Sequence, residues 1–223
     1  HAALDPDPFR QFAHWFGEAI ETQVLDPNAM SIASVAADGQ PSLRTVLLKY
    51  YDASGFVFYT NLESRKAREI NANPRVALLF YWAELSRQVR ITGTACHTSA
   101  AENLRYFLSR PRDSQIGAWV SAQSSVISSR SLIENKFMEM RRKFAAGEVP
   151  LPSFWGGYRV QAETIEFWQA GEHRLHDRVA VQVGSRELVG VVVDIAEASG
   201  DAVRLRPITS RLDAAPLRPP GLF

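Results

Sequence analysis

The sequence predicts a mainly β protein with peripheral helices, built around an antiparallel sheet or barrel. Strand-like runs rich in Val, Leu, Ile, Phe and Tyr lie around residues 30–36, 43–51, 56–60, 75–82 and 87–97. Turn-forming residues such as Asp38-Gly39 separate these runs. Short consecutive strands with tight connections favour antiparallel pairing over strands that alternate with crossover helices.

An amphipathic helix is expected near the start of the chain. Asp7-Pro8 is a typical helix start, because Asp accepts hydrogen bonds from unpaired N–H groups and Pro fits the first turn. Hydrophobic residues then recur at near-helical spacing and form one face, at Phe9, Phe12, Phe16 and Ile20. We expect this face to pack into the core.

Residues 43–51 and 56–60 are predicted to pair as a β-hairpin around Asp52-Ala-Ser-Gly55. Cations and hydroxyl groups lie at both ends of this hairpin and at the start of a short helix predicted over 64–73. They are Arg44, Lys49, Thr60, Ser64, Arg65 and Lys66. If these side chains converge, guanidinium groups, hydroxyls and a helix N-terminus can together hold a phosphate dianion. A solvated, charged loop is the alternative.

A second phosphate clamp is predicted on a helix further along the chain. Ser99-Ala-Ala-Glu102 has the pattern of a capping box, and the helix is expected to run to about Ser109. Tyr106 and Arg110 lie four residues apart and therefore share a face, where both can donate to one phosphate. An ordinary exposed helix face is the alternative. Later elements are predicted as a helix over 131–144 and strands over 158–168 and 179–183.

Composition limits the classes of partner. Twenty-five basic and 24 acidic side chains give a formal net charge of +1, which provides no overall field to attract nucleic acid or an anionic membrane. No apolar segment approaches the roughly 20 residues that span a bilayer. The single cysteine, Cys96, excludes an intramolecular disulfide and fits a reducing cytosol, so a cytoplasmic protein is expected.

Several blocks of sequence occur in the order expected of pyridoxamine 5'-phosphate oxidases, and the chain resembles that family from about Asp7 to Arg178. The blocks are Arg44 to Lys49, Phe58 to Asn61, Glu63 to Lys66, Phe80 to Trp82, Arg87 to Arg90, Ser109 to Pro111, Ser114 to Gly117, Gln123-Ser124, Trp155 to Tyr158, Glu166 to Gln169 and Arg174 to Arg178. The resemblance implies an FMN-binding split β-barrel and a homodimer with two FMN sites across its interface. Residues 1–207 would form one domain, and residues 208–223 a possible C-terminal extension.

The resemblance also implies a reaction and its residues. The reaction is FMN-dependent oxidation of pyridoxamine 5'-phosphate or pyridoxine 5'-phosphate to pyridoxal 5'-phosphate, with oxygen reduced to hydrogen peroxide. FMN binding is implied for Arg44, Thr45, Val46, Leu47, Leu48, Lys49, Tyr59, Thr60, Arg65, Lys66, Gln88, Gln123, Ser124, Trp168 and Arg178. Substrate binding is implied for Lys49, Tyr106, Arg110, Ser114, Arg174 and His176, of which Arg174 and His176 are the candidate catalytic residues.

Other interpretations stay open at this point. A related split-barrel FMN oxidase could act on another ring, such as a phenazine precursor, and a non-catalytic protein could bind flavin without productive substrate geometry. Ordinary core packing is the alternative for Trp168. A metal site at His173, His176 and Asp177 is disfavoured, because Arg174 and Arg178 would oppose a nearby divalent cation. No metal is therefore expected.

Overall fold

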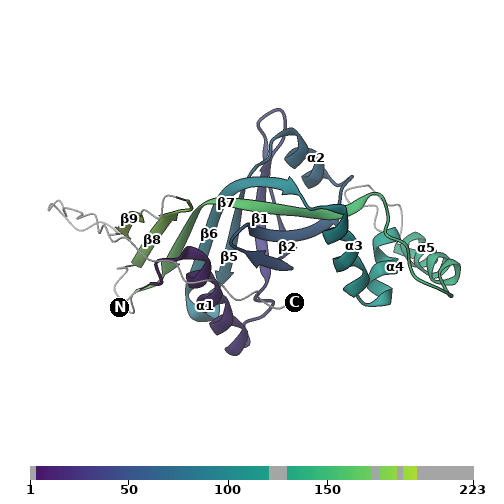
Figure 1. Cartoon of the computed structure of the whole chain (residues 1–223), viewed down its shortest axis with the longest axis horizontal. Coiled ribbons are helices and arrows are strands. Elements are labelled where there is room, and N and C mark those ends of the chain that lie inside the picture. Colours follow the sequence, from purple (N-terminus) through teal and green to yellow (C-terminus); the bar gives the residue numbers. More distant parts are fainter. Residues whose placement is uncertain (1–3, 121–129, 172–175, 185–187, 195–223) are drawn as a thin grey trace.

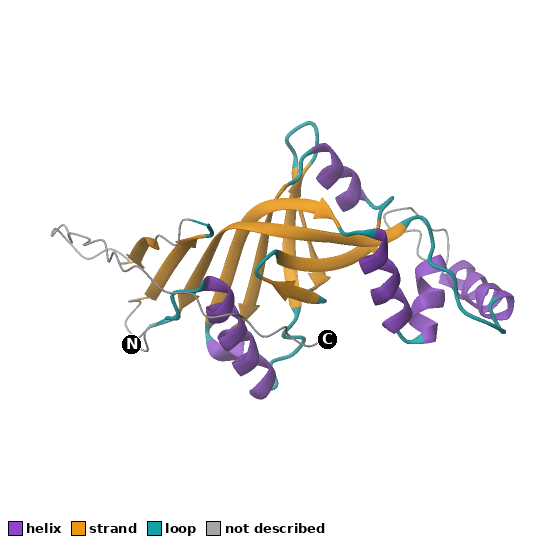
Figure 2. Ribbon diagram, viewed as in Figure 1, coloured by secondary structure: helices purple, strands orange, loops and turns teal. Residues whose placement is uncertain are grey.

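The computed structural model describes residues 4–120, 130–171, 176–184 and 188–194. Figures 1 and 2 show a curled antiparallel sheet with helices around it. Helices α3, α4 and α5 lie at one end of the long axis, and strands β8 and β9 lie at the other (Figure 1). The prediction of a mainly β fold with peripheral helices is confirmed.

The described elements are, in chain order, α1 (Pro8–Glu21), β1 (Ala29–Val35), β2 (Pro41–Leu47), β3 (Tyr50–Asp52), β4 (Gly55–Asn61), α2 (Arg65–Ala72), β5 (Arg75–Trp82), the 3-10 turn η1 (Ala83–Leu85), β6 (Arg87–His97), α3 (Ala100–Ser109), α4 (Arg112–Val120), α5 (Arg130–Lys143), β7 (Trp155–Gln169), β8 (His176–Gln182) and β9 (Leu188–Asp194). Sequence patterns did not predict α4. Its nine residues follow Pro111 and include Gly117, so they carry little helical periodicity.

The order of the strands requires the sheet to curl. The order is β2-β1-β5-β6-β7-β4-β3, so β2 and β3 lie at opposite ends of this path. Only Leu48 and Lys49 separate them along the chain. The Leu48 N–H donates to the Asn28 carbonyl on one side, and the Lys49 N–H donates to the Val57 carbonyl on the other. A two-residue link can join the two ends only if the sheet closes into a barrel-like curve.

The predicted hairpin over 43–51 and 56–60 is therefore wrong in part. Only β3 pairs with β4, around the turn that ends at Gly55, whereas β2 pairs with β1. The run of residues 43–51 is broken at Leu48, whose side chain is fully buried and turns into the core. Arg44, the cation of β2, therefore contacts Ser34 on β1 and Glu69 on α2, and not a partner along a hairpin with β4.

Strand β7 divides the sheet into two parts. Residues Trp155 to Val160 pair with β4, and Thr164 to Gln169 pair with β8 along the same edge. Strand β6 pairs with β7 along the other edge, with a register shift after Thr92. The bulge bends the strands between the two parts, so the barrel and the β8–β9 extension share β6 and β7.

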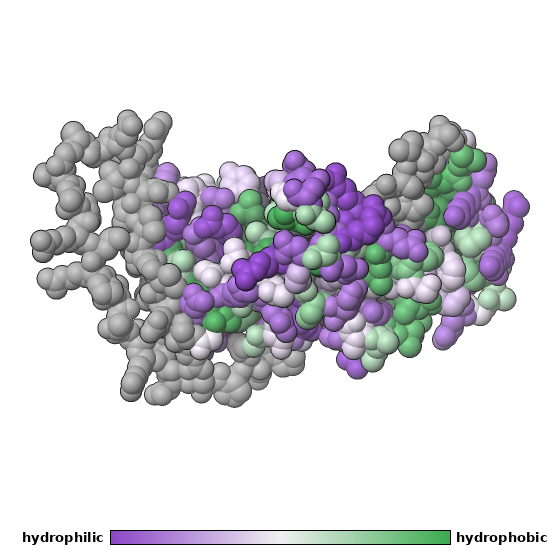
Figure 3. Space-filling view, turned by 90° about the horizontal axis from the view of Figure 1, so that it is seen from above, coloured by the Kyte–Doolittle hydropathy of each residue, from purple (hydrophilic) through white to green (hydrophobic). Residues whose placement is uncertain are grey.

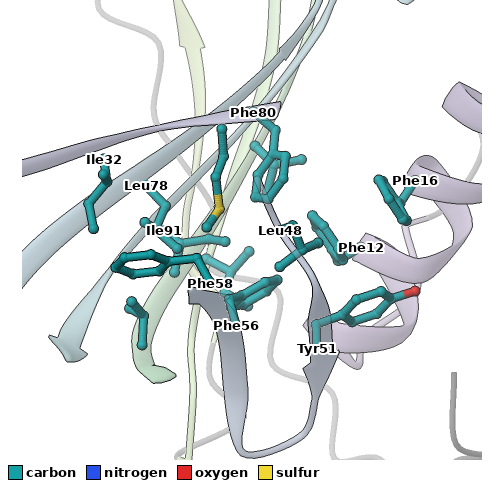
Figure 4. Close-up of a cluster of buried hydrophobic side chains, with 14 of the residues drawn as sticks. Phe12, Phe16, Ile32, Leu48, Tyr51, Phe56, Phe58, Leu78, Phe80 and Ile91 are labelled. Atoms are coloured by element: carbon teal, nitrogen blue, oxygen red, sulfur yellow. The ribbon is translucent and has the colours of Figure 1, made fainter. Parts of the chain in front are cut away.

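Helix α1 closes the barrel core. The Asp7 carboxylate accepts from the backbone N–H groups of Phe9 and Arg10, which fixes the first turn. Figure 4 shows Phe12 and Phe16 pointing from this helix toward the side chains of the barrel. Ile20, by contrast, is 41% exposed. It lies at the edge of the apolar stripe, where Trp15 and Ala19 are buried in its place.

A second core holds the helical end together. It consists of Phe107, Ile116, Ala118, Val120, Met140, Phe144, Val149 and Trp155. Helix α3 begins with the predicted capping box, in which Ser99 and Glu102 exchange hydrogen bonds. Within the described ranges, no helix is long and apolar enough to cross a membrane. The described part of the chain also holds no cluster of His, Cys, Asp and Glu suited to a metal ion.

Candidate functional site

A pocket of about 610 Å³ lies between the closed barrel and the helical end. Its walls come from β2, β4, α2, α3, α4 and β7, and consist of Thr45, Val46, Leu47, Lys49, Tyr59, Thr60, Lys66, Tyr106, Ser109, Arg110, Pro111, Ser114 and Trp155. Seven of these residues were predicted to bind cofactor, and four, counting Lys49 in both groups, to bind substrate. Ser109, Pro111 and Trp155 were not predicted.

Three stacked aromatic rings form one wall of the pocket. The ring of Tyr59 lies parallel to that of Tyr106, with 4.1 Å between centroids, and to that of Trp155, with 5.0 Å. Burial, followed by the nearby Glu102 carboxylate, raises the pKa of Tyr59 to about 12. The Tyr59 hydroxyl therefore stays neutral at physiological pH, and the wall offers flat apolar faces with polar tips.

Arg110 lines the pocket beside the aromatic wall. Its Nη1 atom is buried and has no hydrogen-bond partner among the described residues. Its Cζ atom lies 5.0 Å from the centre of the Trp155 ring, which holds the guanidinium in place. A guanidinium at the wall of a pocket suits an anionic oxygen, because it can donate charge-assisted hydrogen bonds. Tyr106 and Ser114 line the same pocket, as the predicted substrate clamp requires.

Two lysines line the pocket at different places. Burial, and after it the positive charge of Arg110, lowers the pKa of Lys49. Burial, and after it the charge of Arg44, lowers the pKa of Lys66. The Lys66 Nζ atom donates to Thr60 Oγ1 at 3.0 Å. Cations held this close to one another in a partly buried space favour anionic ligands, whose charge would offset their repulsion.

Arg44 and Arg65 do not line the pocket but meet behind Lys66. Both guanidinium groups bind the buried carboxylate of Glu69, at 3.0 and 2.7 Å. Arg65 and Glu69 lie four residues apart on α2, so their sequence spacing could have indicated the pair. Nothing in the sequence places Arg44 beside Glu69, because they meet through the packing of α2 against β1, the strand that pairs with β2.

A second group of predicted residues lies at the opposite end of the sheet. Gln88 on β6 lies directly opposite Trp168 on β7, and Trp168 lies directly opposite Arg178 on β8. Directly opposed residues share one face of a sheet, so these three side chains form a row. The His176 ring lies 4.9 Å from that of Trp168. None of these four residues lines the pocket, and β8 and the helical end lie far apart along the molecule (Figure 1).

Four further predicted residues do not belong to either group. Leu48 packs its side chain in the barrel core, and both its backbone polar groups bind Asn28. Gln123, Ser124 and Arg174 lie outside the described residues, as does the predicted extension over 208–223.

Two models of known protein families match this chain. The model of the family described as pyridoxamine 5'-phosphate oxidase matches residues 16–144. The chain belongs to the pyridoxamine 5'-phosphate oxidase family. A second model, described as the pyridoxine 5'-phosphate oxidase C-terminal dimerisation region, matches residues 155–188. The family resemblance expected from the sequence blocks is thus confirmed.

Individual relatives agree with this membership. The chain is 63% identical over 175 residues to a pyridoxine/pyridoxamine 5'-phosphate oxidase of Rippkaea orientalis. The aligned residues make up 78% of this chain and 82% of the relative. It is 60% identical over 179 residues to the enzyme of that name from Escherichia fergusonii, covering 80% and 82%.

Solved structures show the same fold. PhzG from Burkholderia lata, in complex with tetrahydrophenazine-1-carboxylic acid, is 26% identical with a TM-score of 0.79, covering 84% of this chain and 93% of that one. A pyridoxamine 5'-phosphate oxidase-related, FMN binding protein from Nostoc punctiforme has a TM-score of 0.65 at 14% identity, covering 81% and 96%. The expected split-barrel fold of this oxidase family is confirmed.

Proposed function

We propose that this oxidase converts pyridoxamine 5'-phosphate or pyridoxine 5'-phosphate to pyridoxal 5'-phosphate with bound FMN, and that oxygen is reduced to hydrogen peroxide. The observation that carries the proposal is the pocket, which is lined by two groups of cationic and hydroxyl side chains that suit phosphates. Lys66 and Thr60 lie on α2 and β4, and Lys49 and Arg110 lie near α3. Two phosphates, one of the cofactor and one of the substrate, account for both groups.

The residues of this chain suit FMN. Lys66 and Thr60 line the pocket and would donate to its phosphate, and the guanidinium groups of Arg44 and Arg65, bound to Glu69, would add positive charge nearby. Residues 45–47 of β2 line the pocket with backbone and side chains that can border a flat ring. When bound, FMN supplies the acceptor of the two electrons that leave the substrate carbon.

The substrate would be held by the other group. The Arg110 guanidinium would donate to the phosphate, and Lys49, Tyr106 and Ser114 line the same pocket. Fixing the phosphate at one end orients the pyridine ring, so the reacting carbon meets the cofactor in a defined position. In the amine reaction, water then releases ammonia and leaves the aldehyde, whereas the alcohol gives the aldehyde directly.

We further infer that two subunits complete each site. The row formed by Gln88, Trp168 and Arg178 lies at the opposite end of the sheet from the pocket, although both groups match cofactor residues of the family. A second copy would bring its row to the pocket of the first. The match of residues 155–188 to a dimerisation region supports this arrangement.

Exposed apolar surface also supports self-association. Figure 3 shows hydrophobic side chains gathered at the helical end of the molecule. The large exposed ones on α3 and α5 are Leu104, Leu108, Leu132, Ile133 and Met138. Side chains of this kind are typical of surface that another chain covers.

Anaerobic mixing of FMN-loaded protein with pyridoxine 5'-phosphate tests the activity. We expect loss of the oxidised flavin absorbance with the phosphorylated substrate and much slower loss with pyridoxine, which lacks the phosphate that Arg110 would bind. A flavin that stays oxidised with both B6 phosphates would overturn the proposal.

A phenazine precursor is the second candidate substrate. It is favoured by the likeness to PhzG, whose structure contains tetrahydrophenazine-1-carboxylic acid. Such a ring carries a carboxylate and no phosphate, so it would use fewer of the donors around Lys49 and Arg110. Reduction of the flavin by a reduced phenazine carboxylate, but not by pyridoxine 5'-phosphate, would establish this alternative.

A further inference from the structure

Glu69 is a buried carboxylate at the centre of a closed polar network. Its side chain is 5% exposed. One oxygen, Oε1, accepts from Arg65 Nε at 2.7 Å. The other, Oε2, accepts from Ser34 Oγ at 2.6 Å, from Ser42 Oγ, and from Arg44 Nη2 at 3.0 Å.

The two serines connect the carboxylate to the arginine a second time. Arg44 donates to Ser34 Oγ through Nη1 and to Ser42 Oγ through Nη2. Each hydroxyl therefore accepts from Arg44 and donates to Glu69. This arrangement fixes the plane of the Arg44 guanidinium relative to the carboxylate, and α2 fixes Arg65 relative to both.

The network also balances charge. Arg44, Arg65 and Lys66 bring three positive charges together beside the pocket, and their mutual repulsion opposes folding. The Glu69 carboxylate offsets one of them, which leaves two positive charges. A phosphate monoester carries up to two negative charges near neutral pH, so the cluster matches it in sign and magnitude.

We propose that Glu69 is a positioning residue that fixes the positive charges of Arg44 and Arg65 beside the phosphate of FMN. Glu69 itself makes no contact with the cofactor, because its two oxygens are occupied by the serines and arginines. This role rests on the proposed binding of FMN at the pocket, and adds to it the reason why the phosphate is recognised. Without Glu69, the two guanidinium groups lose their shared anchor and their fixed direction.

Titration of the cofactor-free full-length protein with FMN and with riboflavin tests the role, with protein fluorescence as the readout. Riboflavin has the same ring and ribityl chain but lacks the phosphate. We expect Glu69→Gln to weaken FMN binding by about tenfold or more and to leave riboflavin binding unchanged. A purely structural defect would weaken both ligands equally, because it would distort the whole pocket.

Two further variants keep the test decisive. Ser42→Ala removes one bridging hydroxyl from an edge strand while retaining all charges, and we expect the same selective loss for FMN in smaller degree. It replaces Glu69→Gln if that protein does not fold. Asp52→Asn removes the carboxylate of a different ion pair, with Arg159 at 2.8 Å, and should change neither affinity.

Three outcomes would contradict the inference. FMN affinity in Glu69→Gln equal to that of the wild type, or higher because a negative charge has been removed, would show that positioning is unimportant. Equal weakening of FMN and riboflavin would reduce Glu69 to a structural role. Failure of the wild-type protein to bind FMN would overturn the proposed function itself, and this result is distinct from the other two.

Discussion

The ring of Tyr59 rests on Gly157, its direct partner across the β4–β7 pair. A Cβ atom at position 157 would lie 2.8 Å from Tyr59 Cε1 and 2.7 Å from Thr98 Oγ1, closer than such atoms can approach. The glycine thus allows Tyr59 to lie flat and to stack on Tyr106 and Trp155. The second glycine of the Trp-Gly-Gly-Tyr block has a physical role in shaping the pocket.

Gly157→Ala should therefore displace Tyr59 and disturb the aromatic wall. We expect a loss of stability on the order of 1–3 kcal/mol from overpacking, together with a several-fold rise in the KM for pyridoxine 5'-phosphate. Thermal unfolding and steady-state kinetics measure the two effects. Gly17→Ala is a suitable control, because a Cβ there meets nothing within 4 Å on helix α1, and it should be neutral or stabilising. Unchanged kinetics in Gly157→Ala would show that the stack does not shape the substrate site.

Arg110→Ala should weaken substrate binding more than it slows chemistry. Removing a charged donor to phosphate costs about 1.5–3 kcal/mol, or one to two powers of ten in affinity. Stopped-flow reduction over a range of pyridoxine 5'-phosphate concentrations separates the limiting rate from the apparent affinity. Arg105 lies on α3, which ends just before Arg110, and does not line the pocket that contains Arg110. The concentration dependence of Arg105→Ala should therefore match that of the wild type. Unchanged affinity of Arg110→Ala for pyridoxine 5'-phosphate would show that Arg110 does not bind the substrate.

Mixed dimers provide a test of the shared site. Arg110→Ala alters the pocket, and Arg178→Ala alters the row at the other end of the sheet. The assay uses a substrate concentration at which each variant alone shows little activity. If each site combines the pocket of one subunit with the row of its partner, random pairing of the two variants should then restore about a quarter of wild-type activity, because half of the dimers carry one intact site. Dimers re-formed from denatured, differently tagged chains allow the measurement. No recovery on mixing would place both groups in the same subunit's site.

Acid should remove the contribution of Glu69 to stability. Burial alone would raise the pKa of Glu69, but hydrogen bonds from Ser34, Ser42, Arg65 and Arg44 lower it to about 2. Because the folded pKa lies below the ordinary value of 4.5, the stabilisation is present above about pH 4.5 and is lost as the pH falls toward 2.

Urea unfolding of the wild type and of Glu69→Gln across this pH range measures the effect. The difference between the two midpoints should be greatest above about pH 4.5 and should narrow as the pH falls. A constant difference down to pH 2 would mean that the carboxylate does not titrate in this window. The effect concerns folding and is separate from any pH dependence of catalysis.

Local patterns predicted most of the elements but not how they pair. The Asp7 cap and the Ser99 capping box set helix starts that the structure confirms, because such signals depend on neighbouring residues alone. The break at Leu48 was missed, since Val and Leu continue through it without a turn signal. Which edge a strand joins depends on contacts distant in sequence, and local composition does not encode them.

The same distinction applies to the site. Tyr106 and Arg110 were found together because helical spacing brings them to one face, and both line the pocket. The Arg44–Glu69 pair was not predicted, because it depends on the packing of α2 against β1 and on the pairing of β1 with β2. Trp155 belongs to a quoted block yet was given no role, and its contact with Arg110 became visible only in the fold.

The link between β2 and β3 also limits how this chain can change in evolution. Leu48 enters the core and Lys49 the pocket, so successive residues face opposite environments. Adding or removing one residue here would exchange the two directions, and would place an ammonium group in the hydrocarbon interior and a leucine in the pocket. Most surface connections tolerate changes of length. We expect the link between β2 and β3 to be fixed at two residues, because its length sets both the closure of the barrel and the position of Lys49 in the pocket.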